Sequence, residues 1–371
     1  MKTRLSDFDL AVILYTSPLP PSATLKRLKD IFLVDPGDEL VSIARQDELL
    51  GHREGLRRLI ELKLNELAVW VENTEVILQQ ISDLLMTFNV ALPLLVVGIL
   101  LLLNPIQGSI SLWIFSVFGL IAGAFAYRQF PGNIRFPNPP LTNLVPLSLI
   151  PLLTYLLSSH ELLFIALTLA SLPSAIITYR KTRNIFNELK ENDKLLTDAL
   201  RCPFHLYRCI KPDLLHVQEV NISISNTIRS VLELYGKLGV DKQGLRWLTE
   251  YYRQFFKLVT NIRSKTLIVL FNSIVGMLVL SVGLSLITSV FTGLRSMHTL
   301  TLGLALNINP QTLESIRPLL NITLIADSIS YSVAISSVRE GNPLYFPLYL
   351  PAMFLATFAG LVLGPLIIPL G

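Results

Sequence analysis

Few residues in this chain have both the type and the setting that favour chemistry, and Asp327 is the first of them. Asp327 is the only carboxylate well inside a long apolar run. An ionisable residue in such a run is a candidate functional residue, because its charge is costly to bury. A structural role is also consistent with the sequence, since Asp327 can face other helices and bond to Ser328, Ser330 or Tyr331. Both interpretations stay open at this level.

Metal binding is a second chemistry that the residue types suggest. Cys202, His205 and Cys209 place three potential ligands near one helix face. A zinc site requires a fourth ligand, however, and Pro203 would disturb the helix. We therefore expect ordinary packing, no metal and no cofactor. Because the chain has only these two cysteines, the sequence argues against a disulfide scaffold and is typical of a reducing compartment.

Signatures of the common catalytic classes are missing from the sequence. It contains no G-x-x-x-x-G-K-[ST], no H-E-x-x-H and no G-x-S-x-G. The histidines do not cluster: they are His52, His160, His205, His216 and His298. We expect a protein that is not an enzyme.

The composition determines which elements must position these residues. Of the 371 residues, 51% are hydrophobic and 16% are charged, and the mean hydropathy is +0.54. These values predict a polytopic membrane protein. With the apolar and charged segments described below, we expect an all-α, polytopic helical membrane protein with about seven transmembrane helices and two cytoplasmic helical domains. The opening residues MKTRLSDFDL lack the apolar core and cleavage site of a secretory signal, so we expect the N-terminus to be retained in the cytoplasm.

Seven apolar segments are candidate membrane spans, because crossing about 30 Å of hydrocarbon takes roughly 20 helical residues. The third segment is short and contains Pro146 and Pro151. Residues 144–179 therefore form either two crossings or a re-entrant hairpin. The candidate spans are Leu84–Leu103, Ile110–Tyr127, Leu144–Leu157, Leu162–Tyr179, Thr266–Phe291, Leu319–Val338 and Leu344–Ile368.

Basic residues predict the orientation of these spans, because Lys and Arg are retained on the cytoplasmic side. With the N-terminus inside, 29 of the 31 basic residues fall on the inner side, and only Arg295 and Arg317 fall outside. The predicted segments are a cytoplasmic helical domain (1–83), a transmembrane hairpin (84–127), a Pro-rich cytoplasmic loop (128–143), a transmembrane or re-entrant hairpin (144–179), a second cytoplasmic helical domain (180–265) and a three-span domain (266–371).

The second cytoplasmic segment shows two amphipathic helical stripes, which predict a helical hairpin. Gly236 and Gly239 supply a stop between the stripes, and Asp241 supplies the N-cap of the next helix. No helix breaker separates that helix from the apolar run at Thr266, so we predict one continuous helix. The stripe residues are Ile228, Val231, Leu232, Tyr235, Leu245, Leu248, Tyr252, Phe255, Val259 and Ile262.

Two further features have possible partner-binding roles. The turn between the last two spans, REGNP, is tight and charged, and it includes Arg339, Glu340 and Gly341. Gly341 suits a positive φ, so a larger residue there would strain the turn.

The charged face of residues 1–83 is either a solvated surface or a docking surface. The Pro-rich loop RQFPGNIRFPNPP is predicted to be an extended, semi-rigid spacer.

Two stretches carry a resemblance to a known family. The first is IRSVLELYGKLGVDKQGLRWLTEYYRQFFKLVTNIRSKTLIVLFNSIVG and the second is DSISYSVAISSVREGNPLYFPLYLPAMF. They resemble the second hairpin and the closing pair of spans of the platform proteins of type II secretion, type IV pili and archaeal flagella, in their archaeal and tight-adherence branch. The amino-terminal segment fits only by position and helical character, and it is shorter and more acidic than the pattern.

The resemblance implies a membrane platform in the cytoplasmic membrane. Such a protein binds a cytoplasmic hexameric secretion ATPase, receives its motion and helps to move pilin-like subunits from the lipid bilayer into a growing filament. It implies no direct contact with nucleic acid, and self-association into a homo-oligomer is left open. The alternative is a helical transporter or channel in which Asp327 and the Pro-broken third span line a pathway.

Overall fold

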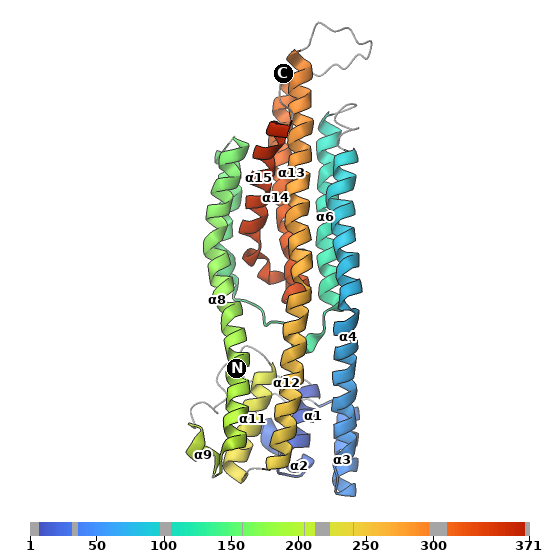
Figure 1. Cartoon of the computed structure of the whole chain (residues 1–371), viewed down its shortest axis with the longest axis vertical. Coiled ribbons are helices and arrows are strands. Elements are labelled where there is room, and N and C mark those ends of the chain that lie inside the picture. The colour runs from blue at the N-terminus through green and yellow to red at the C-terminus, as the bar shows by residue number, and fades with distance from the viewer. Residues whose placement is uncertain are drawn as a thin grey trace. The chain divides into compact units, whose positions relative to one another are not determined.

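The computed structural model describes residues 7–31, 36–96, 105–157, 159–203, 205–211, 223–239, 241–296 and 310–367. Every regular element in these residues is a helix, as Figure 1 shows, so the predicted all-helical class is confirmed. The chain divides into two compact units. We call Met1–Thr74, Pro131–Pro137 and Thr182–Ser264 the charged unit, and Glu75–Phe130, Asn138–Lys181 and Lys265–Gly371 the apolar unit.

The charged unit combines helices from both segments that the sequence analysis treats as separate cytoplasmic domains. Two of its helices, α4 and α8, also contribute residues to the apolar unit. Its elements are α1 (Asp7–Thr16), α2 (Pro21–Ile31), α3 (Asp38–Leu50), the first part of α4 (Glu54–Met86), η2 (Gly132–Ile134), the last part of α8 (His160–Arg201), α9 (Leu206–Cys209), α11 (Ser223–Leu238) and α12 (Lys242–Lys265).

Helix α1 lies at the centre of the charged unit. Its five consecutive apolar residues from Leu10 to Leu14 are all fully buried. Toward α11, Thr227 donates a hydrogen bond to the Asp9 carboxylate at 2.9 Å. Toward α12, the ring of Tyr15 lies 4.5 Å from that of Trp247. Because α1 contacts both α11 and α12, the amino-terminal segment supplies the core against which both stripes pack.

Burial of the two predicted stripes confirms the helical periodicity. All ten stripe residues, four on α11 and six on α12, are buried. After α12 ends at Lys265, only Thr266 intervenes before α13 begins at Leu267. Helical conformation continues from Lys242 to Ser289, as the absence of a breaker predicts.

The apolar unit contains the rest of α4 and α8 and the remaining helices (Figure 1). A π-helical turn, η1 (Thr87–Ala91), interrupts the helix that begins as α4. The other elements are α6 (Pro105–Gln129), η3 (Leu141–Ser148), α7 (Leu149–Leu156), α13 (Leu267–Ser296), α14 (Pro310–Arg339), η4 (Pro343–Leu348) and α15 (Leu350–Ile367).

Glycines permit the closest helix contacts in the apolar unit. Gly119 and Gly123 of α6 lie against α14, where a Cβ on Gly119 would fall 1.9 Å from Ser330 Oγ. Gly360 and Gly364 of α15 lie in the same way against α13, where a Cβ on Gly360 would fall 2.0 Å from Ser281 Oγ. Both pairs have the G-x-x-x-G spacing that lets helix backbones approach closely in lipid.

Among the residues that the structure describes, five helices are long and apolar enough to cross a membrane. They overlap the first, fourth, fifth, sixth and seventh predicted spans. The second and third spans coincide with shorter apolar helices, at Ile114–Gln129 and Leu141–Leu156 in the described residues. The five long helices are Val76–Val96, His160–Arg201, Lys242–Ser289, Pro318–Arg339 and Leu350–Ile367.

The Pro-rich loop is extended at Pro131, Arg135 and Pro140, but Gly132–Ile134 form a 3-10 turn, so the predicted extended spacer is only partly observed. Arg135 has φ −64° and ψ 136°, close to polyproline II geometry. Ile134 and Phe136 are nevertheless buried, and the Phe136 ring lies 5.8 Å from that of Phe186 on α8. The loop therefore contributes two apolar side chains to the core of the charged unit.

Candidate functional site

The turn that follows α14 is built around Gly341. This glycine has φ +65°, and a Cβ at its position would lie 2.3 Å from a ring carbon of Phe130, at the end of α6. Two independent constraints therefore select glycine: the left-handed backbone and the nearby ring. The predicted positive φ is confirmed, whereas the contact with Phe130 could not be foreseen from the sequence.

The charges of this turn are arranged inward rather than on a surface. Glu340 is 1% exposed, and its Oε1 accepts a 2.6 Å hydrogen bond from the hydroxyl of Tyr349. The guanidinium carbon of Arg339 lies 5.8 Å from the centre of the Tyr349 ring, within the range of a cation–π interaction. Tyr349 thus joins both charged residues of the turn to the start of α15. A partner cannot reach the Glu340 carboxylate without opening this turn.

Asparagine side chains fix the rest of the turn. Asn342 Oδ1 accepts from the backbone N–H of Leu344 at 3.0 Å, which caps η4. Its Nδ2 donates to Asn138 Oδ1 at 2.9 Å, and Lys181 of α8 donates to the Asn138 carbonyl at 3.2 Å. The turn after α14 is therefore tied to the loop after α6 and to α8 by specific polar contacts.

Three buried polar residues of α14 form a polar layer that contacts α6, η1 and α4: they are Asp327, Ser330 and Tyr331. Asp327 is 1% exposed, and its carboxyl group faces Ser116 of α6. One turn further along α14, Ser330 donates to the Ser116 carbonyl at 2.9 Å and lies 3.5 Å from Nδ2 of Asn89. Tyr331 donates to the Leu85 carbonyl at 3.2 Å. The sequence names Ser330 and Tyr331 as partners of Asp327, but in the structure their hydroxyls bond to backbone carbonyls of other helices.

Asn89, which contacts this layer, is the residue that sequence analysis missed. It is fully buried, and it lies in η1, the π-helical turn. Single π-helical turns inside helices are rare overall, but those that occur are often found at functional sites. The signal in the sequence that could have identified it is a polar asparagine within an apolar run. Its importance depends on α14, which is more than 230 positions away in the sequence and supplies Ser330.

The hairpin residues have different roles from one another. Gly239 follows the end of α11 with φ +101°, so it ends that helix as predicted. Asp241 accepts from the N–H of Gln243 at 3.0 Å, which confirms it as the cap of α12. Gly236 is different, because it lies within α11 and does not stop it. A Cβ there would lie 2.5 Å from the ring of Tyr207, so Gly236 makes room for that ring.

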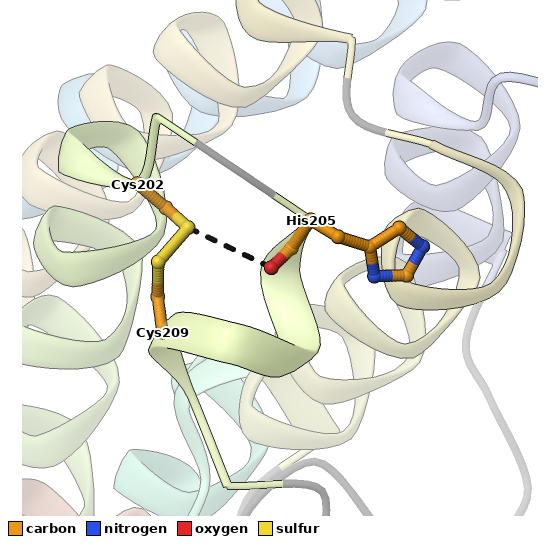
Figure 2. The surroundings of a disulfide bond; sticks show 3 residues. All are labelled: Cys202, His205 and Cys209. Carbon is orange, nitrogen blue, oxygen red and sulfur yellow. Dashed lines mark hydrogen bonds between the residues drawn. A yellow bond between two sulfur atoms is a disulfide. The ribbon is translucent and has the colours of Figure 1, made fainter.

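The two cysteines form a disulfide, which corrects the expectation of reduced, unpaired thiols. Figure 2 shows Cys202, at the end of α8, bonded to Cys209 in α9. The Cys202 sulfur lies 3.8 Å from the carbonyl oxygen of His205, whose imidazole points away from the bond (Figure 2). The metal ligand is the free thiolate, so in the bonded state neither sulfur is available for the zinc site considered from the sequence.

Comparison with protein-family models, with curated proteins and with solved structures finds no match to this chain. The fold therefore defines the class: in the described part of the chain, an all-helical protein with five helices long and apolar enough to span a membrane.

Proposed function

We propose that this chain is the membrane platform of a type IV pilus-like or type II secretion-like machine, which couples a cytoplasmic secretion ATPase to pilin extraction and filament assembly. The observation that carries the proposal is helical continuity. Three helical runs, α4, α8 and Lys242–Ser289, each contain residues of the charged unit and residues of the apolar unit. A platform requires such continuity, because displacement at a water-exposed surface has to reach helices in the bilayer.

In this proposal the charged unit receives the ATPase and the apolar unit contacts the lipid bilayer and the pilin-like subunits. The protein lies in the cytoplasmic membrane with its N-terminus inside. A cysteine probe at Gln243 should then be protected from a membrane-impermeant maleimide in intact cells, whereas one at Thr299, which lies outside the described residues, should be labelled. The opposite pattern would refute this topology.

The proposal is tested by breaking one continuous helix at its midpoint. Ser264→Pro removes an i→i−4 hydrogen bond and clashes with the preceding turn, at a local cost of ~3 kcal/mol. The protein should still insert, because its apolar runs are unchanged. A purified secretion ATPase should still bind in a pull-down experiment, but filaments counted by electron microscopy should be lost.

The matched control is Lys242→Pro in the same helix. Lys242 is the first residue of α12, where proline is tolerated because that N–H has no partner within the helix. This variant should assemble filaments normally. Equal filament numbers in Ser264→Pro and Lys242→Pro would show that the helix does not transmit motion.

The second candidate is a helical transporter or channel with Asp327 in the pathway. It is favoured by the burial of Asp327 next to Ser116 of α6. Purified protein in liposomes would then conduct a solute or ion, and Asp327→Asn would abolish the flux. The platform proposal instead predicts no flux through the wild-type protein in liposomes and loss of filaments in Ser264→Pro. These two experiments separate the two functions.

A further inference from the structure

Helix α9 is tied to two other helices of the charged unit, once by a covalent bond and once by packing. The disulfide joins Cys209 of α9 to Cys202, which follows the end of α8. The packing is against α11, where the Tyr207 ring lies where a side chain on Gly236 would be. The Tyr207 hydroxyl also donates to the Glu233 carbonyl of α11 at 3.5 Å. Helix α9 therefore bridges α8 and α11.

Helix α9 is too short to keep this position by itself. It has four residues, and the backbone N–H of Ile210 donates to the Leu206 carbonyl at 2.9 Å. A single helical turn is unstable in isolation, because its nucleation fixes several residues for one hydrogen bond. The place of α9 therefore depends on the disulfide and on its packing. Breaking the disulfide leaves α9 held by packing.

The two cysteines differ in their access to solvent. Cys202 is 7% exposed, whereas Cys209 is an exposed residue. Thiol–disulfide exchange begins when a thiolate attacks one of the two sulfurs, and access helps to decide which. An incoming thiolate therefore meets Cys209, and Cys202 is the leaving group. The Cys202 sulfur lies 3.8 Å from the His205 carbonyl oxygen, which can accept a weak S–H bond once this sulfur carries a proton (Figure 2).

We propose that Cys209 is a thiol–disulfide exchange site, at which a protein dithiol opens the disulfide and releases α9 from α11. One thiolate of the reductant attacks Cys209 Sγ, the S–S bond breaks, and Cys202 leaves as a thiolate that takes up a proton. The second thiol of the reductant attacks the mixed disulfide, so Cys209 is released as a thiol and the reductant becomes a disulfide. Two electrons and two protons pass from the reductant to this chain.

The release of α9 changes the surface that the charged unit presents. Tyr207 leaves α11, so the face of that helix at Gly236 is uncovered. In the orientation proposed above this unit faces the cytoplasm, where lasting disulfides are rare and those that form are mostly transient, in catalysis or redox sensing. The orientation is the one part of the proposed function that this inference uses, and maleimide labelling at Gln243 tests it separately.

The test uses the purified full-length protein in detergent, first oxidised with glutathione disulfide and then treated with thioredoxin. A thioredoxin variant without its resolving cysteine traps the mixed disulfide, and mass spectrometry should find the adduct on Cys209. Hydrogen exchange of residues 205–211 should become several-fold faster on reduction, while that of α12 stays unchanged. The double variant Cys202→Ser/Cys209→Ser should show the faster exchange without reductant.

A matched pair of variants tests whether packing on α11 protects the disulfide. Tyr207→Ala removes the ring that lies against Gly236, so thioredoxin should reduce its disulfide several-fold faster than that of the wild type. Tyr207→Phe keeps the ring and should be reduced at the wild-type rate.

Three results would overturn the proposal. Reduction that requires denaturant would show that the disulfide does not exchange in the folded protein. An adduct on Cys202 would show that the exchange site is not Cys209. Equal exchange of residues 205–211 in the oxidised and reduced protein would show that the disulfide does not hold α9. All three are measured on the wild-type chain, so they decide even where a variant fails to fold. None depends on filament assembly, so the platform proposal is judged separately.

Discussion

In the charged unit the contacts around α1 are made by large side chains, whereas in the apolar unit the closest contacts occur where a side chain is missing. Tyr15 and Trp247 pack ring against ring in the first unit. Gly119 and Gly360 bring backbones together in the second. Hydrophobic burial drives packing in water but gives little drive between helices already in lipid, where close contact and polar bonds take over. The G-x-x-x-G pairs of the apolar unit are the close contacts that helices in a bilayer use.

The largest expected effect comes from Gly341, which combines positive φ with a close neighbour. Gly341→Val should lower the free energy of unfolding by about 1–3 kcal/mol through backbone strain and by a further 1–3 kcal/mol through overpacking against Phe130. The measurement is denaturant unfolding in detergent, together with the protein level in cells. Gly239→Val is the matched control in the charged unit, because Gly239 also has positive φ but has open space around its Cβ position. Equal losses in the two variants would show that Phe130 does not constrain the turn.

Removing the disulfide should have the next largest effect, and only on the charged unit. Cys202 and Cys209 are separated by seven positions, and closing so short a loop stabilises the folded state by about 2–3 kcal/mol in the chain-entropy description. The double variant Cys202→Ser/Cys209→Ser should lower the unfolding temperature, and dithiothreitol should do the same to the wild type but not to the variant. If both cysteines of the wild-type protein are alkylated without reductant, the thiols are free. That result would contradict the disulfide and favour the reduced state that the sequence suggests.

A smaller loss is expected when the close approach of α6 and α14 is disturbed. Gly119→Ala places a methyl group 1.9 Å from Ser330 Oγ, so Ser330 must rotate and give up its bond to the Ser116 carbonyl. The expected cost is about 1–3 kcal/mol in detergent unfolding. Gly132→Ala, with nothing near its Cβ position, should be within experimental error of the wild type. A neutral Gly119→Ala would mean that the two helices separate easily.

The smallest expected effect concerns a buried phenol of the charged unit. Tyr235 donates to the Thr16 carbonyl at 2.5 Å, so Tyr235→Phe should cost about 1 kcal/mol. Burial, with a contribution from the Asp241 carboxylate, raises the pKa of Tyr235 above its usual value. The folded unit therefore keeps this proton at a pH where the unfolded chain loses it. Its contribution to stability is complete below about pH 10 and declines as the pH rises above that value.

Alkaline unfolding measures this contribution directly. Tyr235→Phe should show a shallower loss of stability between neutral and strongly alkaline pH than the wild type. Identical pH slopes would show that the phenol of Tyr235 ionises as easily in the folded unit as in the unfolded chain.

The sequence by itself determined the features that act over a few residues. Apolar positions at helical spacing determined which faces of α11 and α12 are buried. Gly239 and Asp241 determined where one helix ends and the next begins, because a left-handed backbone and a side-chain cap act within one turn. The long apolar runs likewise predicted seven spans, and five of these overlap helices of the described residues that are long enough to cross a membrane.

Only the tertiary structure decided which distant residues meet. Gly236 has the residue type of a helix stop but lies against Tyr207. Glu340 has the charge of a surface residue but accepts a hydrogen bond from Tyr349. Asn89 meets Ser330 of a distant helix. The pairing of Cys202 with Cys209 is decided in the same way, by how α9 folds back on α8. Local propensity extends over a helical turn, whereas these partners are selected by how the whole set of helices packs, which no short stretch of sequence contains.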